Sequence, residues 1–247
     1  MWQIILQSII SIWIDIQNIT IKTKREEKEQ ILKEKYNINI WIDNNSDILI
    51  LAIKPKQFNE LDLSKFSNNI LIISIMAWIS INKIKEKNNS KKIIRTMPNT
   101  PMSVWKWVIW YIKTSEVIES EDVFFTKTFK KTWILIECIS EDEIDKITAL
   151  SWSWPAYYYY FTEIINDKAI QMWFSEDIAR QISDNTFIWA AKLLEKSKLN
   201  PEELRNNITS PWGTTEKAIE TFKSNWFRKS TTDAIDNAYK KAKELNN

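Results

Sequence analysis

A short turn near the carboxyl-terminal end of the sequence has the residue types of an anion site. Residues 210–215 combine proline, glycine and hydroxyl side chains just before a helical pattern: Ser210, Pro211, Trp212, Gly213, Thr214 and Thr215. Backbone N–H groups in the first turn of a helix lack partners and attract anions, helped by neighbouring hydroxyl groups. With glycine at position 212, the backbone would approach a bound anion closely. We expect an anion site here, with a plain helix cap as the alternative.

A basic run near the amino-terminal end is the second feature with a chemical interpretation. Lys22, Thr23, Lys24 and Arg25 follow the apolar run 19–21 and precede a predicted helix. At this place in a dinucleotide-binding βα unit, an acidic residue binds a ribose 2′-hydroxyl, whereas basic residues accommodate a 2′-phosphate. No acidic residue occurs before Glu26, which favours NADPH over NADH. The alternative is an exposed helix start with ordinary surface charge.

Composition excludes several kinds of active site. The chain of 247 residues has no histidine and one cysteine, which excludes a His-based triad, a Cys/His zinc site and an intramolecular disulfide. We therefore expect no metal, and we expect Cys138 to be buried in its apolar run rather than to act as a nucleophile. The 34 basic and 32 acidic residues leave a net charge of +2, which indicates no nucleic-acid partner.

Hydropathy indicates neither a membrane span nor a secretory signal. No apolar run reaches the roughly 18 residues that a membrane span needs, and the amino-terminal residues lack the ordered sections of a signal peptide. Together with the single cysteine, these observations lead us to expect a cytoplasmic protein without membrane partners.

Two patterns divide the chain. Short β-branched runs alternate with polar helical segments up to about residue 135, which is typical of a parallel, doubly wound Rossmann-type sheet. The expected strands are 19–21, 48–53, 70–75 and 92–95, with a helix over 25–35. Long helical segments then follow, with Pro155, Pro201 and Pro211 at first-turn positions: 142–150, 156–172, 175–197, 201–206 and 214–247. We predict an α/β domain over 1–140 and an all-α domain over 141–247.

The numbers of tryptophans and glycines are inverted relative to ordinary proteins. The chain has 14 Trp and 1 Gly, whereas ordinary composition predicts roughly 17 glycines in this length. Trp152, Trp154 and Trp212 stand beside serine and proline, where a backbone needs glycine. We hypothesise that the native gene uses UGA as a glycine codon and that these positions are glycine in the native protein. The alternative is functional tryptophans, at a membrane interface or stacked on sugars or bases.

Three segments together resemble the pyrroline-5-carboxylate reductase family. Residues 95–101 are Arg-Thr-Met-Pro-Asn-Thr-Pro, similar to the family's R-x-M-P-N-T-P loop. With Trp taken as Gly, residues 151–157 become S-G-S-G-P-A-Y and residues 208–215 become I-T-S-P-G-G-T-T. Trp78 and Trp189 also stand at family glycines, in segments that resemble A-G-V/I-S and G-A-A-K. The similarity covers essentially the whole chain.

The resemblance implies reduction of 1-pyrroline-5-carboxylate to L-proline by hydride transfer from NADPH, with NADH as a second candidate. It implies a dinucleotide-binding domain over 1–140 and a substrate-binding and dimerisation domain over 141–247, in a homodimer or a larger homo-oligomer. Residues 210–215 would bind the substrate carboxylate, and Thr215, the one expected catalytic side chain, would face the ring nitrogen. The cofactor would contact Lys22, Thr23, Lys24, Arg25, Ala52, Ile53, Lys54, Pro55, Met97, Pro98, Asn99 and Thr100.

The amino-terminal end departs from the family pattern. The family begins with a strand and a G-x-G-N-M-G phosphate loop, of which Met1 and Trp2 correspond to the last two residues. We expect Met1 and Trp2 to contact the cofactor, the first strand to be missing, and the chain to be inactive as it stands. A related imine or β-hydroxyacid reductase and a noncatalytic regulatory or binding relative are the alternative functions. The aromatic run 157–161 is expected in a core or a subunit interface.

Overall fold

The computed structural model describes residues 2–12, 14–98, 107–130 and 133–246, and the chain forms two compact units. The α/β unit comprises Met1–Trp152 and Tyr239–Asn247, and the helical unit comprises Ser153–Ala238. The predicted functional division into 1–140 and 141–247 stays a prediction, because compactness alone does not assign a function to either part.

A five-stranded sheet forms the centre of the α/β unit, with strands in the spatial order β1-β2-β3-β4-β5. They are β1 (Ile48–Leu51), β2 (Leu71–Ser74), β3 (Ile93–Pro98), β4 (Trp107–Lys113) and β5 (Trp133–Glu137). All neighbouring pairs are parallel except β3 and β4, which are antiparallel. The connection 99–106 is too short for the crossover that parallel neighbours need. The Rossmann-type α/β class is confirmed, with one antiparallel pair that the sequence patterns did not predict.

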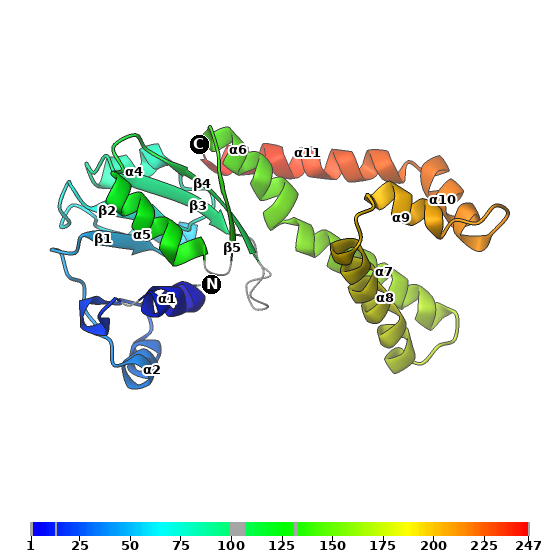
Figure 1. The fold of residues 1–247 in the computed structure, drawn as a ribbon, viewed down its shortest axis with the longest axis horizontal. Helices are drawn as coiled ribbons and strands as arrows, with labels where there is room; N and C mark the ends of the chain where they lie inside the picture. The colour runs from blue at the N-terminus through cyan, green and yellow to red at the C-terminus, as the bar shows by residue number, and fades with distance from the viewer. Residues whose placement is uncertain (1, 13, 99–106, 131–132, 247) are drawn as a thin grey trace. The chain divides into compact units, whose positions relative to one another are not determined.

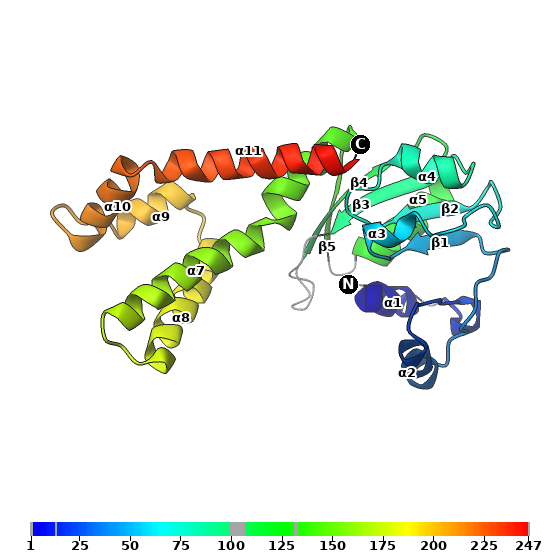
Figure 2. The same cartoon turned by 180° about the vertical axis from the view of Figure 1, so that it is seen from behind.

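Alternation along the strands places two apolar layers on opposite faces of the sheet. Leu71 and Ile73 of β2 pack on one face with Ile5 of α1 (Trp2–Ser11) and Phe125 of α5 (Glu119–Lys130). Ile72 of β2 packs on the other face, against α3 (Pro55–Phe58) and α4 (Ile81–Lys87). Figure 1 shows α5 in front of the sheet and α1 below it, and Figure 2 shows α3 and α4 from the opposite side. Helices on both faces are the expected doubly wound arrangement.

The expected strand at 19–21 is wrong as a member of the sheet. It forms only an isolated parallel bridge between Thr20 and Asn39. The side chain of Ile19 in this segment is buried with Leu6 of α1 and Leu32 of α2 (Glu26–Tyr36) in a separate small core. The apolar pattern therefore predicted burial correctly, but the burial is achieved against helices.

The remaining elements of the α/β unit follow the sheet in sequence. α6 (Glu141–Ile147) continues into a π-helical turn, Thr148–Trp152, and a short 3-10 helix, Ile16–Asn18, follows α1. Cys138 is buried between Met97 and Ile144, and burial raises the pKa of its thiol to about 11. A thiol in this apolar setting is a packing residue, as expected.

The helical unit contains α7 (Trp154–Gln171), α8 (Glu176–Lys196), α9 (Pro201–Asn207) and α10 (Thr214–Ser224), together with the first part of α11 (Phe227–Asn246). The single helix expected over 214–247 is wrong, because α10 and α11 are separated at Asn225 and Trp226. Pro155 and Pro201 lie in first turns as predicted, but Pro211 precedes the cap of α10. No described helix is long and apolar enough to cross a membrane.

Candidate functional site

One carboxylate anchors the basic turn at residues 22–25 to helix α2. Glu29 of α2 accepts hydrogen bonds from the backbone N–H of Thr23 (2.7 Å) and from Lys22 Nζ (3.0 Å). The hydrogen bond from Thr23, and then Lys22, hold the pKa of this buried carboxyl below its usual value. Glu29 is therefore charged at neutral pH and anchors the turn to the helix that follows it.

Lys24 and Arg25 differ in their partners. Lys24 forms an exposed ion pair with Glu60, in the segment after α3. Arg25 is the N-cap residue of α2, and its side chain is exposed with no ion-pair partner within the described parts of the chain. The ion pair of Lys24 brings the basic turn near α3. Because Arg25 has no such partner in the described chain, its guanidinium is available for an anion.

The carboxyl ends of β1 and β2 lie at the same edge of the sheet, because these strands are parallel. Ala52 and Ile53 leave β1 half-buried, and the exposed Lys54 is the N-cap of α3, whose first residue is Pro55. The Lys54 backbone N–H donates to Gln57 Oε1 (3.3 Å). In a doubly wound sheet this edge is where ligands bind, so the geometry is compatible with a backbone lining made by residues 52–55.

The turn after β2 contains a strained residue at this edge. Trp78 has a φ of 62°, and its ring contacts that of Trp152 edge to face with 6.0 Å between the centroids. Ser80 then caps α4 by accepting a hydrogen bond from the Lys83 backbone N–H (3.3 Å). An indole therefore occupies space directly after a strand end of the ligand-binding edge.

The expected nicotinamide contacts are only partly described. Met97 is buried against Cys138 and Ile144, so its side chain serves the core, and Pro98 ends β3. Asn99, Thr100 and Met1 lie outside the described residues, as does the side chain of Trp2. The cofactor-binding roles of these six residues stay predictions.

The sequence patterns did not predict a buried cluster around Arg95 of β3. Arg95 is 1% exposed, and its Nη1 donates to Glu141 Oε1 of α6 (2.5 Å). The same Glu141 oxygen accepts the backbone N–H of Ile81 (3.0 Å) at the start of α4. Arginine is rarely fully buried unless it is paired, so an arginine within an apolar strand was the signal that could have identified this cluster.

The same arginine also binds the carboxyl-terminal end of α11. Its Nη2 donates to Asn246 Oδ1 (3.2 Å) and to Asp145 Oδ1 (3.4 Å), and Asn246 in turn donates to Asp145. Burial raises the pKa of Asp145, although Arg95 partly opposes the shift. Arg95 therefore holds β3, α4, α6 and the end of α11 together within the α/β unit.

The turn at residues 210–215 has the geometry of a tight turn before a helix. The Gly213 N–H donates to the Ser210 carbonyl oxygen (3.0 Å), with Pro211 second and the left-handed Trp212 third in the turn. Proline followed by a residue with positive φ is typical of a type II turn. A Cβ at Gly213 would lie 2.9 Å from the Ser210 carbonyl oxygen, so this position requires glycine.

The start of α10 leaves hydrogen-bond donors for an anion. Gly213 is the N-cap of α10 and makes no side-chain cap. It therefore offers no side-chain acceptor to the Thr214 and Thr215 N–H groups in the first turn. Glu216 Oε2 accepts the Trp212 backbone N–H (2.7 Å), which takes one donor of the predicted site. The arrangement can bind a carboxylate through Thr214 and Thr215, and the catalytic role of Thr215 stays a prediction.

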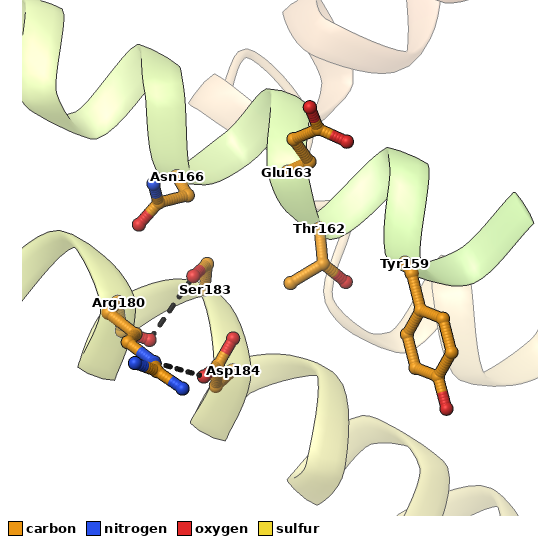
Figure 3. Close-up of a pocket in the computed structure, with 7 residues that line it drawn as sticks. All are labelled: Tyr159, Thr162, Glu163, Asn166, Arg180, Ser183 and Asp184. Carbon is orange, nitrogen blue, oxygen red and sulfur yellow. Dashed lines mark hydrogen bonds and ion pairs between the residues drawn. The ribbon is translucent and has the colours of Figure 1, made fainter. Parts of the chain in front are cut away.

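A hollow of about 310 Å³ lies elsewhere, between α7 and α8. Its lining is Tyr159, Thr162, Glu163, Asn166, Arg180, Ser183 and Asp184 (Figure 3). Arg180 Nε pairs with Asp184 Oδ2 on the same helix (3.4 Å), and Ser183 Oγ donates to the Arg180 carbonyl oxygen (3.1 Å). None of the expected site residues lines this hollow, and we assign it no role.

Comparisons with known proteins agree on one family. Residues 141–245 match the family model for pyrroline-5-carboxylate reductase dimerisation. The chain is 30% identical to the pyrroline-5-carboxylate reductase of Aquifex aeolicus over 239 residues, covering 93% of this chain and 88% of that protein. It is 32% identical to pyrroline-5-carboxylate reductase 1 of Bacillus subtilis over 248 residues, covering 93% and 80%.

Solved structures lead to the same result. The structure of a pyrroline-5-carboxylate reductase from Coxiella burnetii is 28% identical and matches with a TM-score of 0.84, covering 100% of this chain and 95% of that one. The pyrroline carboxylate reductase of Plasmodium falciparum, solved with NADP bound, shares the fold at 24% identity and a TM-score of 0.81, covering 99% and 94%. The chain belongs to the pyrroline-5-carboxylate reductase family.

Proposed function

We propose that this protein reduces 1-pyrroline-5-carboxylate to L-proline with a hydride from NADPH. The observation that carries the proposal is the 32% identity, over 93% of the chain, to a relative named for this activity. The open start of α10 supports it, because the substrate carries a carboxylate and the first-turn N–H groups of Thr214 and Thr215 suit one.

The basic turn supports NADPH as the cofactor. A 2′-phosphate distinguishes NADPH from NADH, and Arg25 presents an exposed guanidinium without an ion-pair partner in the described chain. Lys24 is close by and would exchange its exposed pair with Glu60 for a phosphate, because such surface pairs contribute little stability. The segment 52–55, at the carboxyl edge of the sheet, would line the dinucleotide.

The reaction asks little acid–base chemistry of the protein. NADPH supplies the hydride, which adds to the carbon of the C=N bond, and the protonated ring nitrogen becomes the amine of proline. The charge that accepts the hydride is therefore already on the substrate, and the absence of histidine is compatible with the reaction. Residues 210–215 hold the carboxylate, and the Thr215 hydroxyl orients the ring nitrogen.

We also propose that the protein works as a homodimer or larger homo-oligomer in the cytoplasm. The dimerisation model covers 141–245, and helices in this range expose large apolar side chains. Examples are Tyr159, Tyr160, Phe161, Ile164, Ile178, Leu193 and Phe222. Apolar side chains in this number are typical of a subunit interface, and the single buried Cys138 suits a reducing compartment.

The test is an activity assay on protein purified from cells that carry the gene. With 1-pyrroline-5-carboxylate present, we expect loss of NADPH absorbance and formation of an equal amount of proline. Replacing NADPH by NADH should raise the Michaelis constant for the cofactor. A folded oligomer that binds NADPH but forms no proline would overturn the proposal in favour of a noncatalytic function.

A further inference from the structure

Tryptophan dominates the left-handed backbone positions of this chain. Among the described residues, positive φ outside glycine occurs at Asn37, Trp78, Trp173, Trp212 and Trp226, with values of 53°, 62°, 72°, 61° and 60°. Asparagine is an ordinary occupant of this region, but a bulky residue there is a genuine outlier. Tryptophan makes up 14 of 247 residues and yet four of these five, which its frequency does not explain.

The hydrogen bonds around Trp173 are those of a glycine motif. α7 ends with Met172 as its C-cap, and Trp173 follows it. The Trp173 N–H donates to the Ile170 carbonyl oxygen (2.9 Å), and the Phe174 N–H donates to the Ala169 carbonyl oxygen (3.2 Å). These two bonds define a Schellman motif, whose left-handed position is usually glycine.

Trp226 and Trp212 occupy two more positions of this kind. Asn225 is the C-cap of α10, and Trp226 is the left-handed residue that follows it before α11. Trp212 is the third residue of the Ser210 turn, where a type II turn requires glycine or asparagine. In each case the backbone conformation favours glycine over a bulky residue such as tryptophan.

The indoles at positions 173, 212 and 226 lack the burial that could offset this strain. The side chains of Trp173 and Trp212 are 95% and 98% exposed, and Trp226 is 70% exposed. Elsewhere, Nε1 of Trp110 and of Trp154 is buried without an acceptor in the described chain, although a buried indole N–H usually has one. Strained indoles that are mostly exposed, and inner indoles whose Nε1 has no acceptor in the described chain, are not what selection for tryptophan would leave.

We propose that glycine occupies positions 78, 173, 212 and 226 in the protein that its own cells make, because those cells decode the corresponding codons as glycine. Positions 173 and 226 carry this inference without reference to any ligand. The proposal is therefore independent of the proposed function, and two of the four positions, 78 and 212, lie in turns that we expect to approach a ligand.

The direct test is mass spectrometry of the protein purified from those cells. The tryptic peptides 169–180 and 224–228 contain positions 173 and 226, each with one tryptophan in the sequence as written. We expect both peptides at the mass of a glycine substitution. Tryptophan at either position would overturn the proposal, whether or not the protein reduces its substrate.

A second test compares glycine with alanine at the same sites in recombinant protein. Both substitutions remove the indole, but only glycine relieves the left-handed backbone. We expect Trp173→Gly and Trp226→Gly to melt about 2–4 °C above Trp173→Ala and Trp226→Ala.

The matched control is Trp189, an exposed residue inside α8. A helix interior prefers alanine, so Trp189→Ala should melt about 2–4 °C above Trp189→Gly. The sign of the difference between glycine and alanine should thus reverse between the two kinds of site. The same sign at all three sites would contradict the backbone argument, and the peptide masses remain decisive if these variants do not fold.

Discussion

The two turns expected to bind anions are held in different ways. The basic turn at 22–25 is anchored by a side chain, Glu29, which accepts bonds from Thr23 and Lys22. The turn at 210–215 is shaped by its backbone, through Pro211, a left-handed third residue and a glycine pressed against Ser210. A turn held by one carboxylate responds to pH and charge, whereas a turn held by backbone geometry responds to the addition of a single carbon atom.

The largest effect is expected from Gly213→Ala. The added Cβ would lie 2.9 Å from the Ser210 carbonyl oxygen, so the turn must move away from the start of α10. We expect kcat/KM to fall about 100-fold, because small displacements of positioning groups have effects of this size. Steady-state kinetics on variants made in cells that carry the gene measure it, and Ala218→Gly, later in α10, is the control for general effects on this helix. Unchanged kinetics in Gly213→Ala would show that the turn does not position substrate.

NADPH binding at the basic turn should be weakened by a change of charge rather than by a change of side-chain size. In the double variant Lys24→Glu and Arg25→Glu we expect the Michaelis constant for NADPH to rise at least about tenfold, since two charge-assisted contacts are lost. The constant for NADH should change much less. The conservative double variant to glutamine separates lost attraction from added repulsion, and equal effects on both cofactors would refute the assignment.

A smaller effect is expected at Thr215. Removing one hydroxyl in Thr215→Ala should lower kcat/KM about tenfold, the size of one lost hydrogen bond to a charged group. Thr215→Ser keeps the hydroxyl and should retain most of the activity. If alanine and serine behave alike, the methyl group rather than the hydroxyl is what matters at this position.

The smallest effect is a pH dependence of stability through Glu29. Its pKa is lowered in the folded protein, so its contribution is fully present above the unfolded value of about 4.3 and is lost as pH falls through the folded value. Glu29→Gln should therefore lower the melting temperature at pH 7 and converge with the parent in acid. Parallel melting curves for the two proteins from pH 7 to pH 3 would contradict this role.

Local patterns predicted most of the elements that position these turns. The apolar runs at 48–53, 70–75 and 92–95 form β1, β2 and β3, and Pro155 and Pro201 mark the starts of α7 and α9. The failures have physical causes. An apolar run at 19–21 cannot specify whether a sheet or helices will cover it. The break between α10 and α11 was not predicted, because tryptophan at 226 is not a residue type expected in a left-handed conformation.

The sequence by itself determined the family, the residue types of both anion turns and the excess of tryptophan at glycine-like positions, because these are properties of short segments. The tertiary structure decided which groups are already occupied. Glu29 anchors the basic turn, Glu216 takes the Trp212 N–H, and Arg95 binds residues 46, 50 and 151 positions away. Such partners depend on how distant elements pack, and on burial that makes an unpaired charge costly, so no local pattern could assign them.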